Sequence, residues 1–230
     1  YIDALAQRYN GDLSSARASL DLAYADAMRA LSNKYPDDDD AASLFAESLM
    51  NTMPWNYWID ADNPKPLTIE AINKLEEVLA RNPAHPMAIH LYIHAVESSS
   101  KPERAEAAAD ILLDLVPGAG HLVHMPSHIY WRVGRYADAS KSNEMAAAVD
   151  EAYIAACNAQ GFYPAAYYPH NIHFLWASSS MEGRSKVAIE AGEKVAKNVR
   201  IEMIDQFPGV EFFKTIPMQS LVQFGRWEEV

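Results

Sequence analysis

Two pairs of histidines and one pair of prolines in this chain are separated by 34 positions. The pairs are His90 and His124, His94 and His128, and Pro83 and Pro117. A fixed period of this length is typical of chains built from stacked helix pairs, because one pair alone cannot bury its apolar face. The spacing therefore predicts an array of antiparallel helices.

Hydrophobic periodicity predicts the same class of fold. Apolar residues recur at spacings of three and four, the pattern of amphipathic helices, and no stretch alternates with period two for long. We therefore expect an all-α chain without a sheet. The predicted helices span residues 13–35, 41–53, 68–81, 86–97, 102–116, 121–133, 137–156, 170–180, 186–203 and 212–224.

Short turn motifs separate these helices. Prolines follow the predicted helix ends at Pro36, Pro83 and Pro117, and proline cannot continue a helix because it lacks a backbone N–H. The acidic run 37–40 is expected to supply the N-cap of the helix that follows it. A calcium site in this run is the less favoured interpretation.

One turn sequence occurs in three versions. Residues 129–139 read IYWRVGRYADA, residues 224–230 read FGRWEEV, and residues 181–185 read MEGRS, where the aromatic residue is lost. With the 34-residue period, these segments resemble the helix–turn–helix of the tetratricopeptide repeat, whose turn glycine, aromatic residue and small residue match Gly134, Tyr136 and Ala139. The strings HLVHMPSHIY and YPHNIHF are similar to those of a histidine-rich bacterial group of these repeat proteins.

The resemblance implies a tetratricopeptide-like superhelix of antiparallel helix pairs. We expect residues 1–230 to form a single solenoid domain, a fragment of a longer protein, with insertions at 55–65 and 158–169. In such a solenoid the first helix of each repeat lines the concave surface, and the repeat register places seven of the eight histidines on that surface. They are His90, His94, His121, His124, His128, His170 and His173.

Histidines on neighbouring helices can share one metal ion. Residues three or four apart on a helix lie about 5–6 Å apart at Cβ, and packed helices lie about 8–10 Å apart. Zinc, copper, iron and nickel all accept imidazole nitrogen. Because the chain has one cysteine, Cys157, a carboxylate or water must complete the ligand set, and Glu97 and Glu47 are the candidate carboxylates.

Other residues are weaker candidates for ligand contacts. Trp131 and Arg132 fall at groove positions of the repeat, and Arg132 is a possible carboxylate clamp. Tyr168 lies in an aromatic insertion that either walls a small-molecule pocket or packs in the core. Ser127 is interpreted as a helix-packing residue rather than a nucleophile, and Cys157 as a small buried residue rather than a reactive thiol.

Charge and hydropathy restrict the partners. The chain carries 19 basic and 31 acidic residues, a net charge of −12, which repels nucleic acids and anionic membranes. No apolar run approaches the length of about 20 residues that a membrane helix needs. We expect a soluble protein, with the cytoplasm slightly favoured, no nucleic-acid or membrane partner, and a possible homodimer through a terminal helix pair.

Three functions remain open at this point. The first is a histidine-lined groove that binds a transition metal, a small ligand or both. The second is a metal-free interaction module that binds a peptide, for which groove asparagine and basic residues are the expected marks. The third is a metal-dependent hydrolase or oxidase, in which an open metal position activates water.

Overall fold

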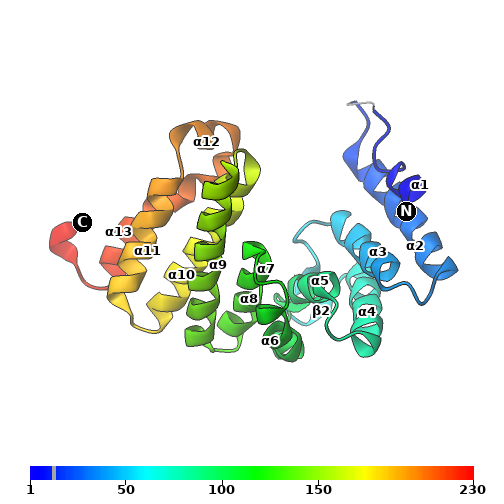
Figure 1. Cartoon of the computed structure of the whole chain (residues 1–230), viewed down its shortest axis with the longest axis horizontal. Helices are drawn as coiled ribbons and strands as arrows, with labels where there is room; N and C mark the ends of the chain where they lie inside the picture. The colour runs from blue at the N-terminus through cyan, green and yellow to red at the C-terminus, as the bar shows by residue number, and fades with distance from the viewer. Residues whose placement is uncertain (12–13) are drawn as a thin grey trace. The chain divides into compact units, whose positions relative to one another are not determined.

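The computed structural model describes residues 1–11 and 14–230, and it separates into two compact units, Tyr1–Leu112 and Leu113–Val230. Figure 1 shows helices in both units, with the first unit running from blue to green and the second from green to red. The prediction of an all-α chain is confirmed. The predicted helix start at Leu13 lies outside the described residues.

The first unit is a succession of helices that pack on their neighbours along the chain. Its larger contacts join α2 to α3, α3 to α4 and α4 to α5. The elements are α1 (Ile2–Leu5), α2 (Arg17–Lys34), α3 (Asp39–Asn51), β1 (Trp58–Asp60), β2 (Asn63–Pro64), α4 (Pro66–Arg81), α5 (Pro86–Val96) and η1 (Pro102–Ala105). Helix α6 (Glu106–Leu115) follows η1 and contains the unit boundary.

The second unit is also built from helices that pack on one another. Helices α9, α10 and α11 pack side by side, and α9 also contacts α7 and α8. The elements are α7 (Gly120–His124), α8 (Pro126–Arg132), α9 (Tyr136–Cys157), the π-helix η2 (Tyr163–Tyr167), α10 (Tyr168–Met181), α11 (Ser185–Asn198), α12 (Ile201–Gln206), η3 (Pro208–Thr215), α13 (Ile216–Gln223) and η4 (Trp227–Glu229).

The three related turn sequences adopt one conformation. Gly134, Gly183 and Gly225 have φ values of 82°, 75° and 69°, a region that is favourable for glycine. After each glycine, an arginine N–H donates to a carbonyl five residues earlier, at 2.8 to 2.9 Å. This pattern is a Schellman cap, which satisfies the last carbonyls of a helix. The turns therefore end α8, α10 and α13 in the same way.

A second kind of helix end precedes proline. Tyr35, Asn82 and Phe207 each have φ between −138° and −127° and ψ between 71° and 79°. The residue before a proline is pushed out of the helical region by the proline ring. At the next helix start, the Asp38 carboxylate accepts from the Ala41 N–H at 2.9 Å, so the predicted acidic N-cap is present.

The structure corrects the expectation that the chain has no sheet. In the insertion 55–65, β1 and β2 form a small antiparallel hairpin. The Trp58 indole N–H donates to the Ala95 carbonyl at 2.8 Å, which ties the hairpin to α5. Period-two alternation could not predict it, because the strands have only three and two residues.

Four predicted helices are interrupted or begin as a 3₁₀-helix, and one of them is 102–116, whose first four residues form η1. Helices α7 and α8 divide the predicted 121–133 segment at Met125, because Pro126 has no N–H for the helical ladder. The 186–203 segment breaks at Val199, which is extended and fully buried. The first part of 212–224 is a 3₁₀-helix, and Pro217 near the start of α13 removes the N–H that would bond to Phe213.

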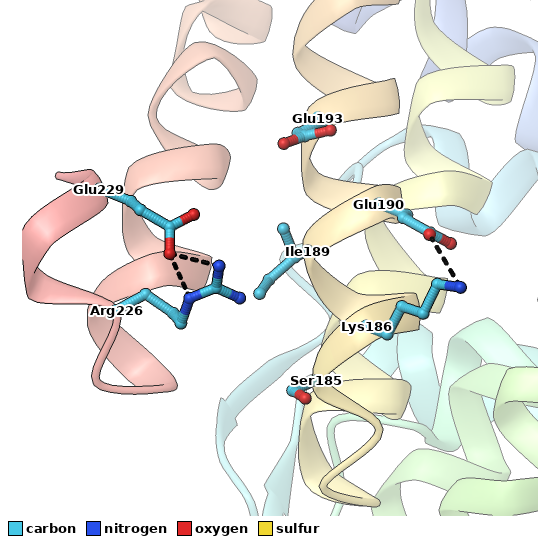
Figure 2. A pocket seen from close by; sticks show the side chains of 7 residues that line it. All are labelled: Ser185, Lys186, Ile189, Glu190, Glu193, Arg226 and Glu229. Carbon is cyan, nitrogen blue, oxygen red and sulfur yellow. Dashed lines mark hydrogen bonds and ion pairs between the residues drawn. The ribbon is translucent and has the colours of Figure 1, made fainter.

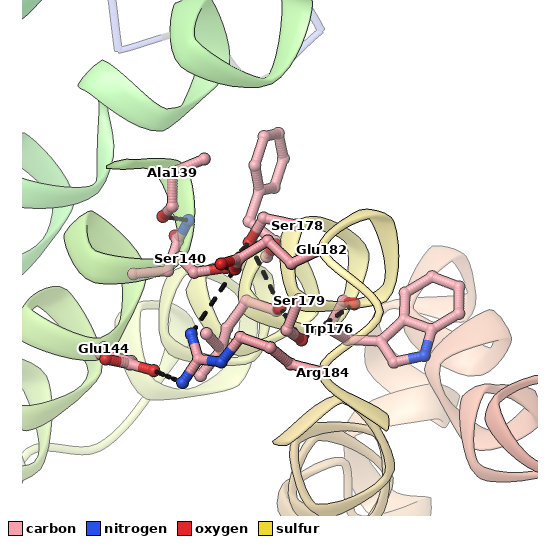
Figure 3. Close-up of polar contacts among 11 residues, drawn as sticks. Ala139, Ser140, Glu144, Trp176, Ser178, Ser179, Glu182 and Arg184 are labelled. Atoms are coloured by element: carbon pink, nitrogen blue, oxygen red, sulfur yellow. Dashed lines mark hydrogen bonds and ion pairs between the residues drawn. The ribbon is translucent and has the colours of Figure 1, made fainter. Parts of the chain in front are cut away.

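Polar as well as apolar residues fill the second unit. An apolar cluster joins Ile172 of α10 to Val195 of α11 and Ile216 of α13. Between α9 and α10 lies the buried hydroxyl pair Ser140 and Ser178, 2.9 Å apart, near the ion pair of Arg184 with Glu144 (Figure 3). Close packing of α9 on α10 therefore uses small hydroxyl side chains. No helix in the described residues is long and apolar enough to cross a membrane.

Candidate metal centre

Three histidines of the second unit converge on one point. They are His124 of α7, His128 of α8 and His170 of α10, and one nitrogen from each ring lies within 4.8 Å of the others. The Nε2 atoms of His124 and His128 are 2.9 Å apart. The centroids of the His124 and His170 rings are 4.7 Å apart. The trio therefore offers three imidazole ligands from three elements.

Local helical geometry explains the pairing of His124 and His128. The two residues are four apart, a spacing that places side chains on one helix face. Met125 lies between α7 and α8 but keeps helical dihedral angles, φ −51° and ψ −39°. The face is therefore preserved across Pro126, although the backbone hydrogen-bond ladder is interrupted.

Asn143 of α9 fixes the orientation of His124. The His124 Nδ1 lies 2.6 Å from the Asn143 Oδ1, and the Asn143 amide donates from Nδ2 to the Ala139 carbonyl at 2.7 Å. Because this second bond identifies Oδ1 as an acceptor, His124 must carry its proton on Nδ1. Its Nε2 then presents a lone pair to His128, the arrangement found in histidines that bind metal.

Burial keeps His124 neutral. Its side chain is fully buried, and desolvation, followed by the neighbouring histidines, lowers the pKa of His124 well below its ordinary value. A neutral imidazole is the form that coordinates a metal ion. Ser127 is also fully buried, and its hydroxyl oxygen lies 3.3 Å from the His124 Nδ1.

Phe174 forms an apolar wall beside the trio. Its ring centroid lies 4.9 Å from that of His124, 4.4 Å from that of His128 and 4.9 Å from that of His170. Phe174 and His170 are four residues apart on α10 and share a helix face. This wall restricts water on one side of the histidines and holds the rings in fixed positions.

His121 extends the cluster along α7. Its ring stacks on His124 at 5.8 Å and meets the edge of Tyr167 at 4.7 Å. Tyr163 stacks on Tyr167 and donates its hydroxyl to Asp150 at 2.7 Å. The aromatic insertion 158–169 therefore packs beside the histidines rather than forming a separate pocket wall.

Asp150 links the elements that carry the trio. Its carboxylate accepts from Tyr163 and, at 2.7 Å, from Asn171, the residue after His170. Desolvation raises the pKa of Asp150, although both hydrogen bonds oppose this effect. A Cβ atom on Gly120, the first residue of α7, would lie 2.0 Å from the Asp150 Oδ1. Asp150 therefore packs against α7 while it holds α10.

The distances are compatible with a metal ion. Two nitrogens on tetrahedral zinc are about 3.4 Å apart, since Zn–N bonds are about 2.0–2.1 Å. The 2.9 Å between the His124 and His128 nitrogens suits an N–H···N hydrogen bond. A separation of the rings by about half an ångström would admit the ion between them.

His173 does not join the trio and is removed from the candidate ligands. Its ring stacks on Trp176 at 5.2 Å and contacts Phe212 and Phe213, each at 5.4 Å. Desolvation there lowers the pKa of His173 to about 4. On α10 a three-residue step rotates the side chain away from the His170 face toward the segment η3, so the ring packs among aromatic residues.

The remaining predicted metal ligands belong to the first unit. His90 and His94 of α5 have ring centroids 5.0 Å apart, and the His94 Nδ1 lies 2.8 Å from the Glu97 Oε1. Glu47 instead accepts from Asn51 at 2.6 Å and lies 3.7 Å from Arg8. The structure therefore groups His90, His94 and Glu97, while Glu47 belongs to a separate polar contact.

The predicted ligand-contacting residues have different surroundings. Tyr168 is buried, and its hydroxyl donates to Glu151 at 2.8 Å, so it is a core residue rather than part of a pocket wall. Trp131 is exposed and its ring lies 6.3 Å from Tyr136. Arg132 is exposed next to it. Cys157, expected to be buried, is exposed at the end of α9.

A separate pocket lies between α11 and the segment after Gly225 (Figure 2). Its volume is about 300 Å³. Lys186 lies 3.9 Å from Glu190, and Arg226 forms an ion pair with Glu229. These charges are paired within the pocket wall, and the lining contains none of the histidines. The histidine trio remains the stronger candidate site.

Sequence reasoning missed Asn143, Asp150 and Phe174. On α9, Asn143 and Asp150 are seven residues apart and share one buried helix face. Polar residues at this spacing ordinarily indicate a solvated face, so the signal was ambiguous. Phe174 could have been identified, because it lies four residues after His170. Searches against family models and curated proteins gave no match to this chain.

Proposed function

We propose that the second unit binds a divalent transition-metal ion through His124, His128 and His170. The observation that carries this proposal is the convergence of three ring nitrogens within 4.8 Å, with the His124 lone pair directed by Asn143. Zinc is the ion that this set suits first, because three imidazoles with one remaining position form a common zinc site.

The packing around the trio supports a preformed site. His124 is held by Asn143 from α9, and Phe174 restricts motion of all three rings. Ligands that are already oriented lose less conformational entropy when the ion binds. A fourth position would take water or an anionic ligand, which is the condition for a hydrolytic or oxidative reaction at such a site.

The scaffold that we propose for this site is a tetratricopeptide-like repeat. The three Schellman caps at Gly134, Gly183 and Gly225 support it, because equivalent turns at the ends of successive first helices are what a repeat predicts. In this arrangement α8, α10 and α13 are equivalent helices, and α9 and α11 are their partners. The histidines then lie on the first helices of the repeats.

The proposal is tested by titrating the full chain with Zn²⁺ in a calorimeter. We expect His170→Ala to weaken zinc binding by at least about 100-fold, since it removes one of three ligands. His173→Ala is the matched control, because it removes an imidazole from the same helix outside the trio. Folding of both variants is checked by circular dichroism and melting temperature.

Two results would overturn the proposal. One is zinc binding in folded His170→Ala that equals that of the parent chain. The other is equal loss of binding in His170→Ala and His173→Ala, which would show that the effect comes from disturbance of α10 rather than from the loss of a ligand.

A further inference from the structure

Helix α5 of the first unit, with the residue that caps its C-terminal end, carries a second group of histidine and carboxylate side chains. Between Ala88 and Val96 this helix is buried except at His90 and His94, which are partly buried. Glu97, at its C-terminal end, is also partly buried. The three residues follow the spacing i, i+4 and i+7, so they lie along one helix face.

His90 and His94 are placed to chelate one ion. Their rings meet edge to face, with centroids 5.0 Å apart and an interplanar angle of 70°. One nitrogen of each ring lies within 4.8 Å of the other. Two imidazoles four residues apart on a helix form the same pairing that zinc-binding helices use.

Glu97 orients His94 for this role. Its Oε1 lies 2.8 Å from the His94 Nδ1, so the carboxylate accepts the proton on that nitrogen and leaves Nε2 as the ligand atom. A carboxylate that holds a ligating histidine in this way raises the basicity of the imidazole and fixes its ring. Glu97 would therefore act on a bound ion through His94.

The rest of the unit holds this helix face in place. The buried His85 caps the start of α5: its Nδ1 accepts from the Ala88 N–H at 3.2 Å, and its Nε2 lies 3.1 Å from Asp40. At the other end, the Trp58 indole N–H donates to the Ala95 carbonyl. Both ends of α5 are fixed, so the positions of His90 and His94 do not depend on a mobile loop.

We infer that His90 and His94 form a second binding site for a divalent transition-metal ion, with Glu97 as its positioning residue. Imidazole pairs favour copper, nickel and zinc, and water or an anionic ligand fills the remaining positions. The site lies in a different unit from the trio of His124, His128 and His170, and it does not rest on the function proposed for that trio.

The test is the zinc stoichiometry of the full chain, measured by equilibrium dialysis at fixed free Zn²⁺ followed by elemental mass spectrometry. We expect two ions per chain. His90→Ala with His94→Ala should remove one ion and leave the other, whereas His124→Ala with His170→Ala should remove the second. His85→Asn is the control, because it removes an imidazole from the same unit and retains a capping acceptor.

Glu97→Gln provides a test that keeps both imidazoles. It should weaken the binding of one of the two ions by about 10- to 100-fold, the usual effect of losing such a partner. The affinity for the other ion should stay unchanged. A parent chain that binds one ion and keeps it in the folded His90→Ala, His94→Ala double variant would overturn the inference. So would a parent stoichiometry of two ions that stays at two in the same folded variant.

Discussion

Asn143 decides how His124 presents its lone pair. Replacing it with leucine keeps a similar volume and removes the acceptor for Nδ1–H, so the ring is free to turn or change tautomer. We predict that Asn143→Leu weakens Zn²⁺ binding by about 10- to 100-fold. Isothermal titration calorimetry measures this change.

Ser140→Ala is the control for Asn143→Leu, because it removes another fully buried polar group of α9 that bonds to Ser178 instead. An unchanged dissociation constant in Asn143→Leu would contradict the role assigned to Asn143.

His173 gives the chain a specific sensitivity to acid. Its pKa in the folded protein is about 4, lowered by desolvation, whereas an exposed histidine has a pKa of about 6.5. As the pH falls, the unfolded chain therefore takes up this proton at a higher pH than the folded protein does. The free energy of unfolding that is present above pH 6.5 is lost progressively as the pH falls toward 4. The loss is at most about 3 kcal/mol.

His173→Phe removes this titration while it keeps an aromatic ring beside Trp176 and Phe213. We predict a smaller decrease in unfolding free energy between pH 7 and pH 4.5 than in the parent chain. Urea denaturation at both pH values measures the difference. Equal decreases in the two proteins would show that His173 is not the group responsible.

The sequence located the histidines but could not determine which face each one takes. His170 and His173 are three residues apart, and either side of α10 was compatible with a shared surface. The aromatic residues that enclose His173 come from η3, about 40 positions later. Local spacing does not predict long-range packing of this kind. It does predict that His124 and His128, four residues apart, share one helix face.

At the scale of elements, the turn glycines end the helices α8, α10 and α13 of the second unit. Gly134 has φ of 82°, and a Cβ atom there would meet nothing within 4 Å. The only cost of an alanine at this position is therefore its unfavourable backbone conformation. We predict that Gly134→Ala destabilises the fold by about 1 kcal/mol. Gly118 also lies in open space but has no positive φ. Gly118→Ala should therefore lower the stability less than Gly134→Ala in the same thermal unfolding experiment.

If Gly134→Ala and Gly118→Ala lower the stability of the fold equally, the positive φ of Gly134 is not the cause of the destabilisation. The same backbone geometry at Gly183 and Gly225 provides two further positions at which the effect can be repeated.

Gly120 is required for a different reason. A Cβ atom there would lie 2.0 Å from the Asp150 carboxylate and 3.1 Å from the Ala146 carbonyl. We predict that Gly120→Ala destabilises the fold by about 1–3 kcal/mol, the usual cost of overpacking. It should also weaken zinc binding, because α7 carries His124. Calorimetric titration and thermal unfolding together measure both effects, and unchanged binding would contradict the link between Asp150 and the trio.

Helix existence was easier to predict than helix interruption. Apolar periodicity located α3, α4 and α9 to within a few residues, because each is long and has clear end signals. The break at Met125 depends on the proline that follows it. The break at Val199 depends on the burial of this one extended residue, which apolar periodicity does not show. The hairpin of β1 and β2 is too short to show any alternation.

At the scale of the whole molecule, the helices form two compact units, and each contains one group of histidines. A single solenoid over residues 1–230 stays a prediction, as does the tetratricopeptide-like superhelix. The 34-residue separation relates His90 to His124 and His94 to His128, so both groups can be understood as copies of one helix face. Repetition of a helix pair would account for the two proposed sites in one chain.

The most direct test of the central claim is X-ray diffraction at the zinc absorption edge from crystals of the chain grown with Zn²⁺. The proposed function predicts an anomalous peak about 2.0–2.1 Å from one ring nitrogen each of His124, His128 and His170. Zinc-loaded crystals with no peak between these three rings would contradict it.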